Sequence, residues 1–216
     1  MQKEAFLAQE NWYGSHYELA IEYYPAANNQ SLLKAIQAIW QFPRLSGPWF
    51  EKTSFGGPPD MLQTLESEGG LVLYGLLEVD KSQQIGCLIS MVREQDGSDW
   101  LDFCIPTGML ELAFNVIYPL LVDDNPWIPR VDQILLDIAE TVYQSSPFNL
   151  AIIGEEVSGY VTANDITRDD LERGGYIVPQ ELLRRLKPDR PSVTLNDNLQ
   201  WFPFRELNIL RIEVTR

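Results

Sequence analysis

The sequence holds few of the residues on which metal binding and nucleophilic catalysis most often depend. It has one histidine, His16, and two cysteines, Cys87 and Cys104, among 216 residues. One histidine cannot supply a histidine-rich metal site or a mechanism with two imidazoles, and two isolated thiols predict neither a disulfide framework nor a zinc site. We therefore expect no metal and no cofactor, and we expect both cysteines to be buried as small apolar side chains.

Long apolar runs are also missing. The richest of them, residues 71–77, is far shorter than the roughly 20 residues that a membrane-spanning helix needs. The first residues carry an acid directly after the first lysine and no apolar stretch, which is not typical of a secretion signal. These features favour a protein that does not cross a membrane and that resides in the cytoplasm.

Basic residues are scarce as well. The chain has 16 lysines and arginines against 31 acids, a formal charge of −15, and a surface of this charge repels phosphate backbones and anionic lipids. Residues 1–166 hold 23 acids and 7 bases, whereas residues 167–216 hold 8 acids and 9 bases. We expect no binding to nucleic acid, and one globular domain over residues 1–216 whose residues 167–216 form a less acidic C-terminal part.

The pattern of apolar residues in the first half predicts a strand, a helix and three further strands. Residues 16–24 alternate between apolar and polar side chains, which is typical of a strand with one buried face. Apolar residues recur at helical spacing over 32–40. Residues 71–79, 85–93 and 99–105 then favour strands joined by short polar turns, as in antiparallel hairpins.

The remaining segments predict further helices and strands. Residues 43–60 favour a long irregular connection. The other expected helices are a short one at 60–68, one at 109–118, one from about Pro126 to Ser146, and short ones beginning at 167 and 178. The other expected strands are one at 150–153, which can continue over 160–162, and a closing strand at 207–214. Together these elements predict an α+β fold, with helices packed on an antiparallel or mixed β-sheet.

Two pairs of acids are candidate site residues. Glu18 and Glu22 project from the same face of the first strand as His16, a group that could bind a metal or move protons, unless this face simply carries charge because it meets water. Glu155 and Glu156 follow a buried strand, where catalytic carboxylates often lie, although neighbouring strand residues point to opposite faces and favour a solvated turn.

Tryptophans beside prolines are the other candidates. Trp49 follows Pro48 and Trp127 follows Pro126, and aromatic rings next to acids could form a protein-binding surface. The alternative is that these rings anchor loops to the core. The basic cluster over residues 184–190 could bind an acidic partner, a phosphate or the acidic part of the same chain.

Three function classes remain open. The leading hypothesis is a non-enzymatic protein-binding domain whose acidic surface meets a basic protein, as an immunity or inhibitor protein would. The alternative is a carboxylate-based or metal-dependent hydrolase that uses Glu18, Glu22, Glu155 or Glu156, which requires these side chains to converge in one cleft. A further alternative is a small-molecule-binding domain, which would be distinguished by a deep apolar cavity between sheet and helices. The sequence leaves the identity of the partner and the oligomeric state open.

Overall fold

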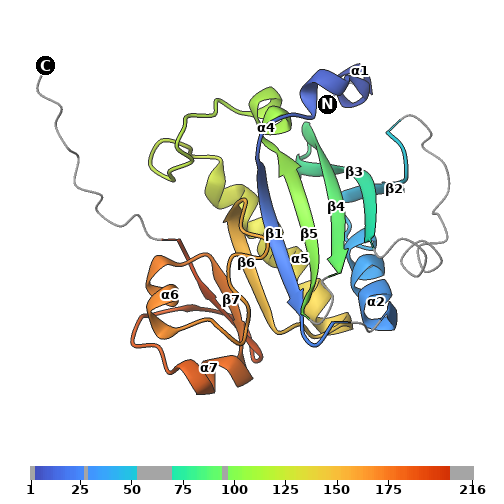
Figure 1. Ribbon diagram of the computed structural model, residues 1–216. Coiled ribbons are helices and arrows are strands. Elements are labelled where there is room, and N and C mark those ends of the chain that lie inside the picture. Colours follow the sequence, from blue (N-terminus) through green and yellow to red (C-terminus); the bar gives the residue numbers. More distant parts are fainter. Residues whose placement is uncertain (1–2, 27–28, 53–69, 94–96, 205–216) are drawn as a thin grey trace, which may run out of the picture.

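One antiparallel sheet organises the chain, for which the computed structural model describes residues 3–26, 29–52, 70–93 and 97–204. The strand order is β2-β3-β4-β5-β1-β6-β7-β9-β8 (Figure 1). The strands are β1 (His16–Tyr23), β2 (Leu45–Trp49), β3 (Gly70–Asp80), β4 (Gln83–Arg93), β5 (Asp99–Pro106), β6 (Leu150–Glu155), β7 (Tyr176–Pro179), β8 (Val193–Asn196) and β9 (Leu199–Phe202). The predicted α+β class is confirmed.

Strand β1 lies in the middle of the sheet, between β5 and β6. Its odd-numbered residues 17–23 belong to the larger apolar core, whereas Ala20 belongs to a second, smaller core on the opposite face. The alternation expected from the sequence is therefore present, and both faces of β1 are covered. This burial on two sides fixes the side chains of β1 more firmly than a half-exposed strand would.

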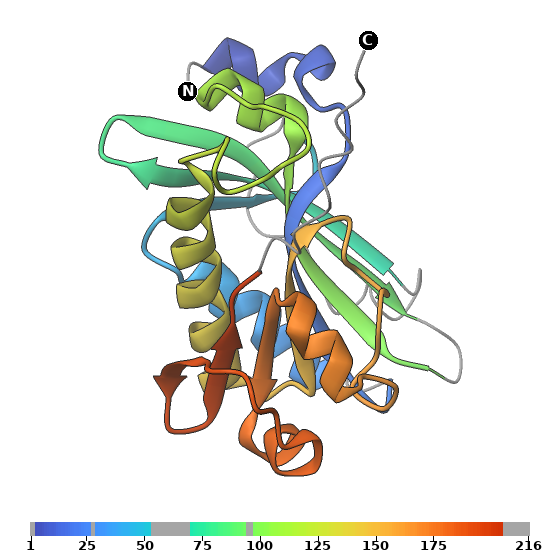
Figure 2. The ribbon, with the colours of Figure 1, turned by 90° about the vertical axis from the view of Figure 1, so that its left-hand side faces the viewer.

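Two long helices cover one face of the sheet. Helices α2 (Asn29–Trp40) and α5 (Ile128–Ser145) pack against each other and against the larger core, and Figure 2 shows both on the same side of the sheet. Their apolar residues recur every three to four positions, so each helix buries one face. Three short helices, α1 (Lys3–Leu7), η1 (Gln9–Asn11) and α4 (Thr107–Ala113), lie at the end of the sheet where β1 begins (Figure 1).

The segment after β6 covers the other face. Residues 156–167, named here the covering loop, are followed by α6 (Arg168–Arg173), and α7 (Gln180–Leu186) comes after β7. Figure 2 shows the covering loop and α6 on the side of the sheet away from α5. Helix α6 begins close to the predicted position 167 with a capping box, since the Thr167 hydroxyl accepts from the amide of Asp170 and the Asp170 carboxylate accepts from the amide of Thr167.

Several boundaries differ from the prediction. The helix expected at 109–118 ends at Ala113, because Phe114 adopts an extended backbone and stacks on Trp127 with ring centroids 5.3 Å apart. Residues 160–162 form no strand, and the helix expected from 178 begins as strand β7. The irregular connection contains β2, and the hairpin of β8 and β9 was not predicted. The elements expected at 60–68 and 207–214 lie outside the described residues.

Within the described residues, no helix combines the length and the apolar character that a bilayer span requires.

Candidate ligand-binding cavity

A cavity of about 760 Å³ opens where strands β6 and β7 diverge, and it is called the β6–β7 cavity below. The two strands pair at Ala151 with Ile177 and at Ile152 with Tyr176, and the amide of Ile153 donates to the carbonyl of Gly175 over 2.7 Å. Beyond this hydrogen bond, the end of β6 continues along β1 while the chain before β7 turns away at Gly174, and both Gly174 and Gly175 have positive φ angles. The divergence leaves space that the side chains of the sheet do not fill.

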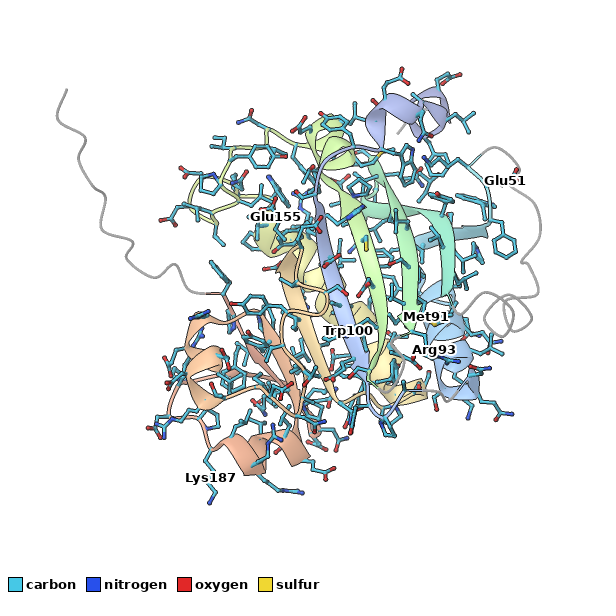
Figure 3. All side chains as sticks on the ribbon, in the orientation of Figure 1. Glu51, Met91, Arg93, Trp100, Glu155 and Lys187 are labelled. Carbon is cyan, nitrogen blue, oxygen red and sulfur yellow. The ribbon has the colours of Figure 1, made fainter. Side chains whose placement is uncertain are left out.

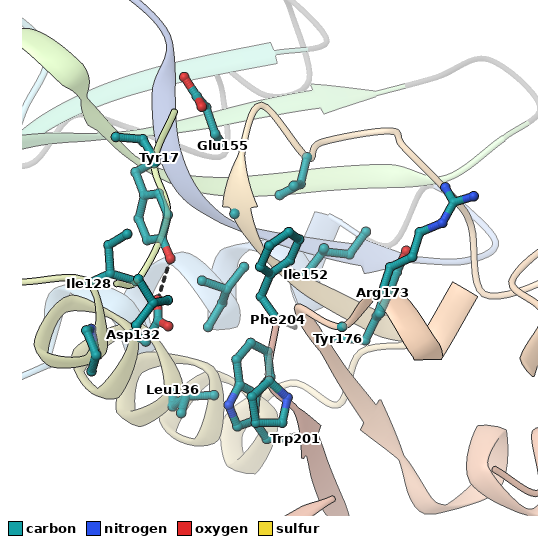
Figure 4. A pocket seen from close by; sticks show the side chains of 18 of the residues that line it. Tyr17, Ile128, Asp132, Leu136, Ile152, Glu155, Arg173, Tyr176, Trp201 and Phe204 are labelled. Carbon is teal, nitrogen blue, oxygen red and sulfur yellow. Dashed lines mark hydrogen bonds between the residues drawn. The ribbon is translucent and has the colours of Figure 1, made fainter. Parts of the chain in front are cut away.

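The walls of the cavity are mainly apolar. They come from the first turns of α5, from the loop before it, from β6, and from the hairpin of β8 and β9 with the two residues that follow it. The close-up in Figure 4 shows Ile128 and Leu136 of α5 on one side, and Trp201 and Phe204 on the other. A volume of this size matches the range of about 300–1,000 Å³ that is typical of pockets for small organic ligands.

One hydrogen-bonded pair lies inside these apolar walls. The buried Tyr17 hydroxyl donates to Oδ1 of half-buried Asp132 over 2.6 Å (Figure 4). Burial raises the pKa of the Asp132 carboxyl to about 6, against a lowering contribution from the Tyr17 hydrogen bond. Burial and the neighbouring carboxylate also raise the pKa of Tyr17, so the phenol remains a proton donor at neutral pH.

Three further ionisable side chains line the cavity. Glu155 accepts a hydrogen bond from the Ser15 hydroxyl over 2.5 Å, and Glu156 accepts from the backbone amide of His16 over 2.7 Å. Arg173 donates to the Tyr160 hydroxyl over 2.8 Å. In the part of the chain that the structure describes, the cavity is lined by three acids, counting Asp132, and one base, and an electrostatic field from these groups favours cations.

Members of the predicted basic cluster lie in different places relative to the cavity, and Arg190 contacts Pro203, one of its lining residues. Figure 3 shows Glu155 near the end of the molecule that holds the start of β1, and Lys187 at the opposite end. In the same cluster, the Arg185 side chain donates to the carbonyl of Ala163, and buried Arg190 donates to the carbonyls of Leu171 and Pro203. These two arginines thus hold backbone segments together.

Glu18 and Glu22 occupy a different place from the one expected for a solvated strand face. Both are buried, with 4% and 0% of their surface exposed, because the covering loop lies over this face of β1. One oxygen of Glu18 accepts from the amides of Val157 and Ser158, each over 2.8 Å. The two oxygens of Glu22 accept from the Ser98 hydroxyl and the amide of Ala163, over 2.5 and 2.6 Å. The covering loop and Ser98 together supply the donors that water would otherwise supply.

Asp102 joins this buried group although the sequence did not single it out. It lies on β5 opposite Ala20, with 4% of its surface exposed, and none of the described residues forms a hydrogen bond with its Oδ1 atom. Burial, with a smaller contribution from the nearby charge of Glu18, raises the pKa of Asp102 to about 7. Burial and the same acids raise the pKa of the Cys104 thiol, which donates to Glu18 over 3.4 Å.

The two candidate tryptophans have structural contacts. Trp127 is buried with 5% of its surface exposed, packs edge-on against Tyr17, and donates its indole N–H to Asn125 over 3.2 Å. Half-buried Trp49 packs edge-on against Phe6, with ring centroids 5.6 Å apart. Trp127 thus anchors the start of α5 in the core, where it also supports the tyrosine that enters the cavity.

The four acids singled out from the sequence do not converge. Glu18 and Glu22 are buried under the covering loop, whereas Glu155 and Glu156 line the cavity at the surface. The described part of the chain contains no group of three or more His, Cys, Asp or Glu side chains arranged to hold a metal ion. The single-cleft arrangement that the hydrolase hypothesis requires is therefore not present.

Tyr17 and Asp132 were missed in the sequence, although one signal was available. Asp132 lies four residues after Ile128 and four before Leu136, so an acid interrupts the apolar stripe of an amphipathic helix. An acid at such a position requires a polar partner or a solvated cavity. The partner, Tyr17, lies 115 residues earlier and could not be identified from local pattern.

Comparisons with protein-family models, with curated proteins and with solved structures found no match for this chain.

Proposed function

We propose that this protein binds a small organic ligand with a predominantly apolar body in the β6–β7 cavity. The observation that carries the proposal is the cavity itself: about 760 Å³, with mainly apolar walls and a part-buried hydrogen-bonded pair, Tyr17 and Asp132. Few convergent polar groups in an apolar cavity are typical of ligand sites, because the walls supply affinity and the polar groups fix orientation.

The position of the cavity supports the same proposal. Its walls are assembled from segments far apart in the chain, from Tyr17 to Phe204, and several are held by the cores on the two faces of the sheet. Trp201 and Ile128 belong to the larger core and Tyr176 to the smaller one. A site on such rigid elements loses little conformational entropy when a ligand binds.

The proposal is tested with Nile red, a neutral apolar dye whose fluorescence rises and shifts to the blue on leaving water. We expect saturable binding at one dye per chain. Leu136→Trp places a large ring in the cavity and should weaken binding at least tenfold, as should Leu195→Trp on the half-buried opposite wall. Leu112→Trp, an exposed position on α4, is the matched control and should bind as the unchanged protein does.

The result that would overturn the proposal is dye binding that does not saturate, or that is equally strong in all four proteins. Urea denaturation of each variant shows whether a loss of binding reflects a filled cavity or a loss of folding. Because Leu195 is less buried than Leu136, the second variant keeps the test decisive if Leu136→Trp does not fold.

The earlier hypothesis of a basic protein partner stays a prediction. Exposed Glu155 and Glu156 line the same cavity as the exposed aromatic rings of Tyr160 and Phe204, a combination that would suit a basic segment with an apolar side chain. Specific binding of one basic protein that is lost as salt rises would support this hypothesis.

A further inference from the structure

The pair of Tyr17 and Asp132 inside the β6–β7 cavity can accept hydrogen bonds from a ligand but has no free donor. The one proton of the Tyr17 hydroxyl is directed at Oδ1 of Asp132. The second carboxylate oxygen of Asp132 has no hydrogen-bond partner among the described residues. An ionised carboxylate can only accept hydrogen bonds, so a ligand group that satisfies this pair must donate.

The charges around the cavity favour a donor that is also positive. Among the described residues, Asp132, Glu155 and Glu156 line it, against the single base Arg173. Figure 4 shows Arg173 on the side of the cavity away from Asp132, and its Nη1 atom already donates to the Tyr160 hydroxyl. An anionic head group at Asp132 would therefore meet like charge, and the described lining residues place no cation beside Asp132 to offset it.

The carboxylate itself gains from a cation. Burial raises the pKa of Asp132 to about 6, which means that the ionised form, still the majority at pH 7, is poorly solvated. An ammonium group at hydrogen-bond distance replaces the missing water with a charge-assisted hydrogen bond, which is stronger than a bond between neutral groups. A neutral hydroxyl at the same place donates as well but carries no compensating charge.

The apolar walls define the rest of the ligand. Leu136 lies one helical turn after Asp132 on α5, and Trp201 faces the same space (Figure 4). An alkyl or aryl body attached to the donor would contact these walls and leave water at roughly 25 cal/mol for each Å² buried. An amphiphilic molecule fits this combination, whereas a compact hydrophilic cation would leave the walls uncovered.

We propose that the β6–β7 cavity selects amphiphilic amines, with the cationic nitrogen at the Asp132 carboxylate and the apolar body against Leu136 and Trp201. Tyr17 is the positioning residue, because its hydroxyl holds one carboxylate oxygen and leaves the other directed to the ligand. This inference rests on the proposed function and adds the chemical class of the ligand.

The experiment compares three probes with the same apolar chain, namely octylamine, octanol and octanoate, each titrated at pH 7.5 for displacement of Nile red from the full chain. We expect octylamine to bind at least tenfold more tightly than octanol, and octanoate to bind most weakly. Asp132→Asn keeps the shape and an acceptor for Tyr17 but removes the charge, and it should reduce the preference for octylamine to about threefold or less.

Asp124→Asn is the matched control, since it removes the same charge from an exposed residue. Asp124 does not line the cavity, although Val122 two residues earlier does. It should leave the preference for octylamine unchanged. An equal loss in both variants would overturn the inference in favour of general attraction to the acidic surface, as would equal affinities for octylamine and octanol or tightest binding of octanoate. In those cases saturable Nile red binding would still support the proposed function, whereas absence of binding by every probe would overturn both.

Discussion

Carboxylates lie against both faces of strand β1, and they differ in how many hydrogen-bond donors the protein supplies to them. On one face Glu18 is buried under the covering loop, and one of its oxygens accepts two backbone amides. On the other face Tyr17 meets Asp132 of α5, whose carboxylate accepts a single hydrogen bond beside a cavity. A buried carboxylate supplied with donors by the protein holds the fold together. A carboxylate that has few donors and lies beside a cavity is available to a ligand.

The comparison also separates two ways of burying charge. The covering loop supplies three backbone amides to Glu18 and Glu22, and Ser98 outside the loop supplies a hydroxyl, so most of their donors depend on the position of that loop. Asp102 lies on the same face with one oxygen unpartnered and a raised pKa, and thus represents the cost of placing several acids together. The chain carries a formal charge of −15, so it has few cations with which to offset such a cluster.

The largest effect is expected at Glu22, which has no exposed surface. Glu22→Ala removes both acceptors from the Ser98 hydroxyl and the Ala163 amide, and should lower the free energy of unfolding by about 3 kcal/mol, because hydrogen bonds to charged groups contribute about 1.5–3 kcal/mol each. Urea denaturation at pH 7.5 measures the change. Glu22→Gln keeps one acceptor oxygen and should lower the free energy of unfolding by clearly less than Glu22→Ala does. A loss below 1 kcal/mol for Glu22→Ala would mean that the covering loop is not held by this carboxylate.

At Asp102 a substitution should raise the free energy of unfolding, the opposite of the effect at Glu22, and the size of the gain should depend on pH. Its pKa is raised from 3.8 to about 7 in the folded protein, so folding favours the protonated form. The resulting loss of stability is absent below pH 3.8, grows as pH rises, and is complete above pH 7. Asp102→Asn removes this penalty and should raise the free energy of unfolding by about 2 kcal/mol at pH 8, with a gain that shrinks towards pH 4. Denaturation curves at pH 4, 6 and 8 measure it, and a gain independent of pH would contradict the assignment.

The sequence predicted the strands around β1 because their alternation is local. The same alternation placed Glu18 and Glu22 on one face, yet it could not show what covers that face, since the amides that bind them lie 139 to 141 residues later. Charge on a strand face normally indicates solvent, so the sequence favoured exposure where the structure has burial. The capping box at Thr167 was predictable because both partners lie within four residues.

The cavity was beyond prediction for a related reason. It depends on β6 and β7 pairing at two positions and then separating, and no periodicity in either strand records that separation. The hairpin that forms one wall was also missed, because β8 and β9 have four residues each and β8 is largely exposed, which leaves a weak apolar pattern. Only the acid within the apolar stripe of α5 carried local information about this site.

A direct comparison of the two faces of β1 comes from removing one charge on each. Asp132→Asn should raise the free energy of unfolding by about 1 kcal/mol at pH 8, because the pKa of the native carboxyl is raised from 3.8 to about 6 and the ionised form is penalised above pH 6. Glu18→Gln should lower it by about 1 kcal/mol, because two amides lose a charged acceptor. The urea midpoints of both variants show whether each substitution raises or lowers the stability. If both change it in the same direction, the two carboxylates do not differ in their contribution to stability.

The smallest effect is local and lies in the covering loop. Because Glu18 binds the amides of Val157 and Ser158, Glu18→Gln should make these two hydrogens exchange with solvent about threefold faster, as local opening becomes easier. Asp132→Asn touches no amide of the loop and should leave their exchange unchanged. Hydrogen exchange read by NMR resolves the two amides, with the amide of Ala163, which Glu22 binds, as an internal reference. Faster exchange at all three amides would show that the loop opens as one unit, so that Glu18 and Glu22 hold it jointly.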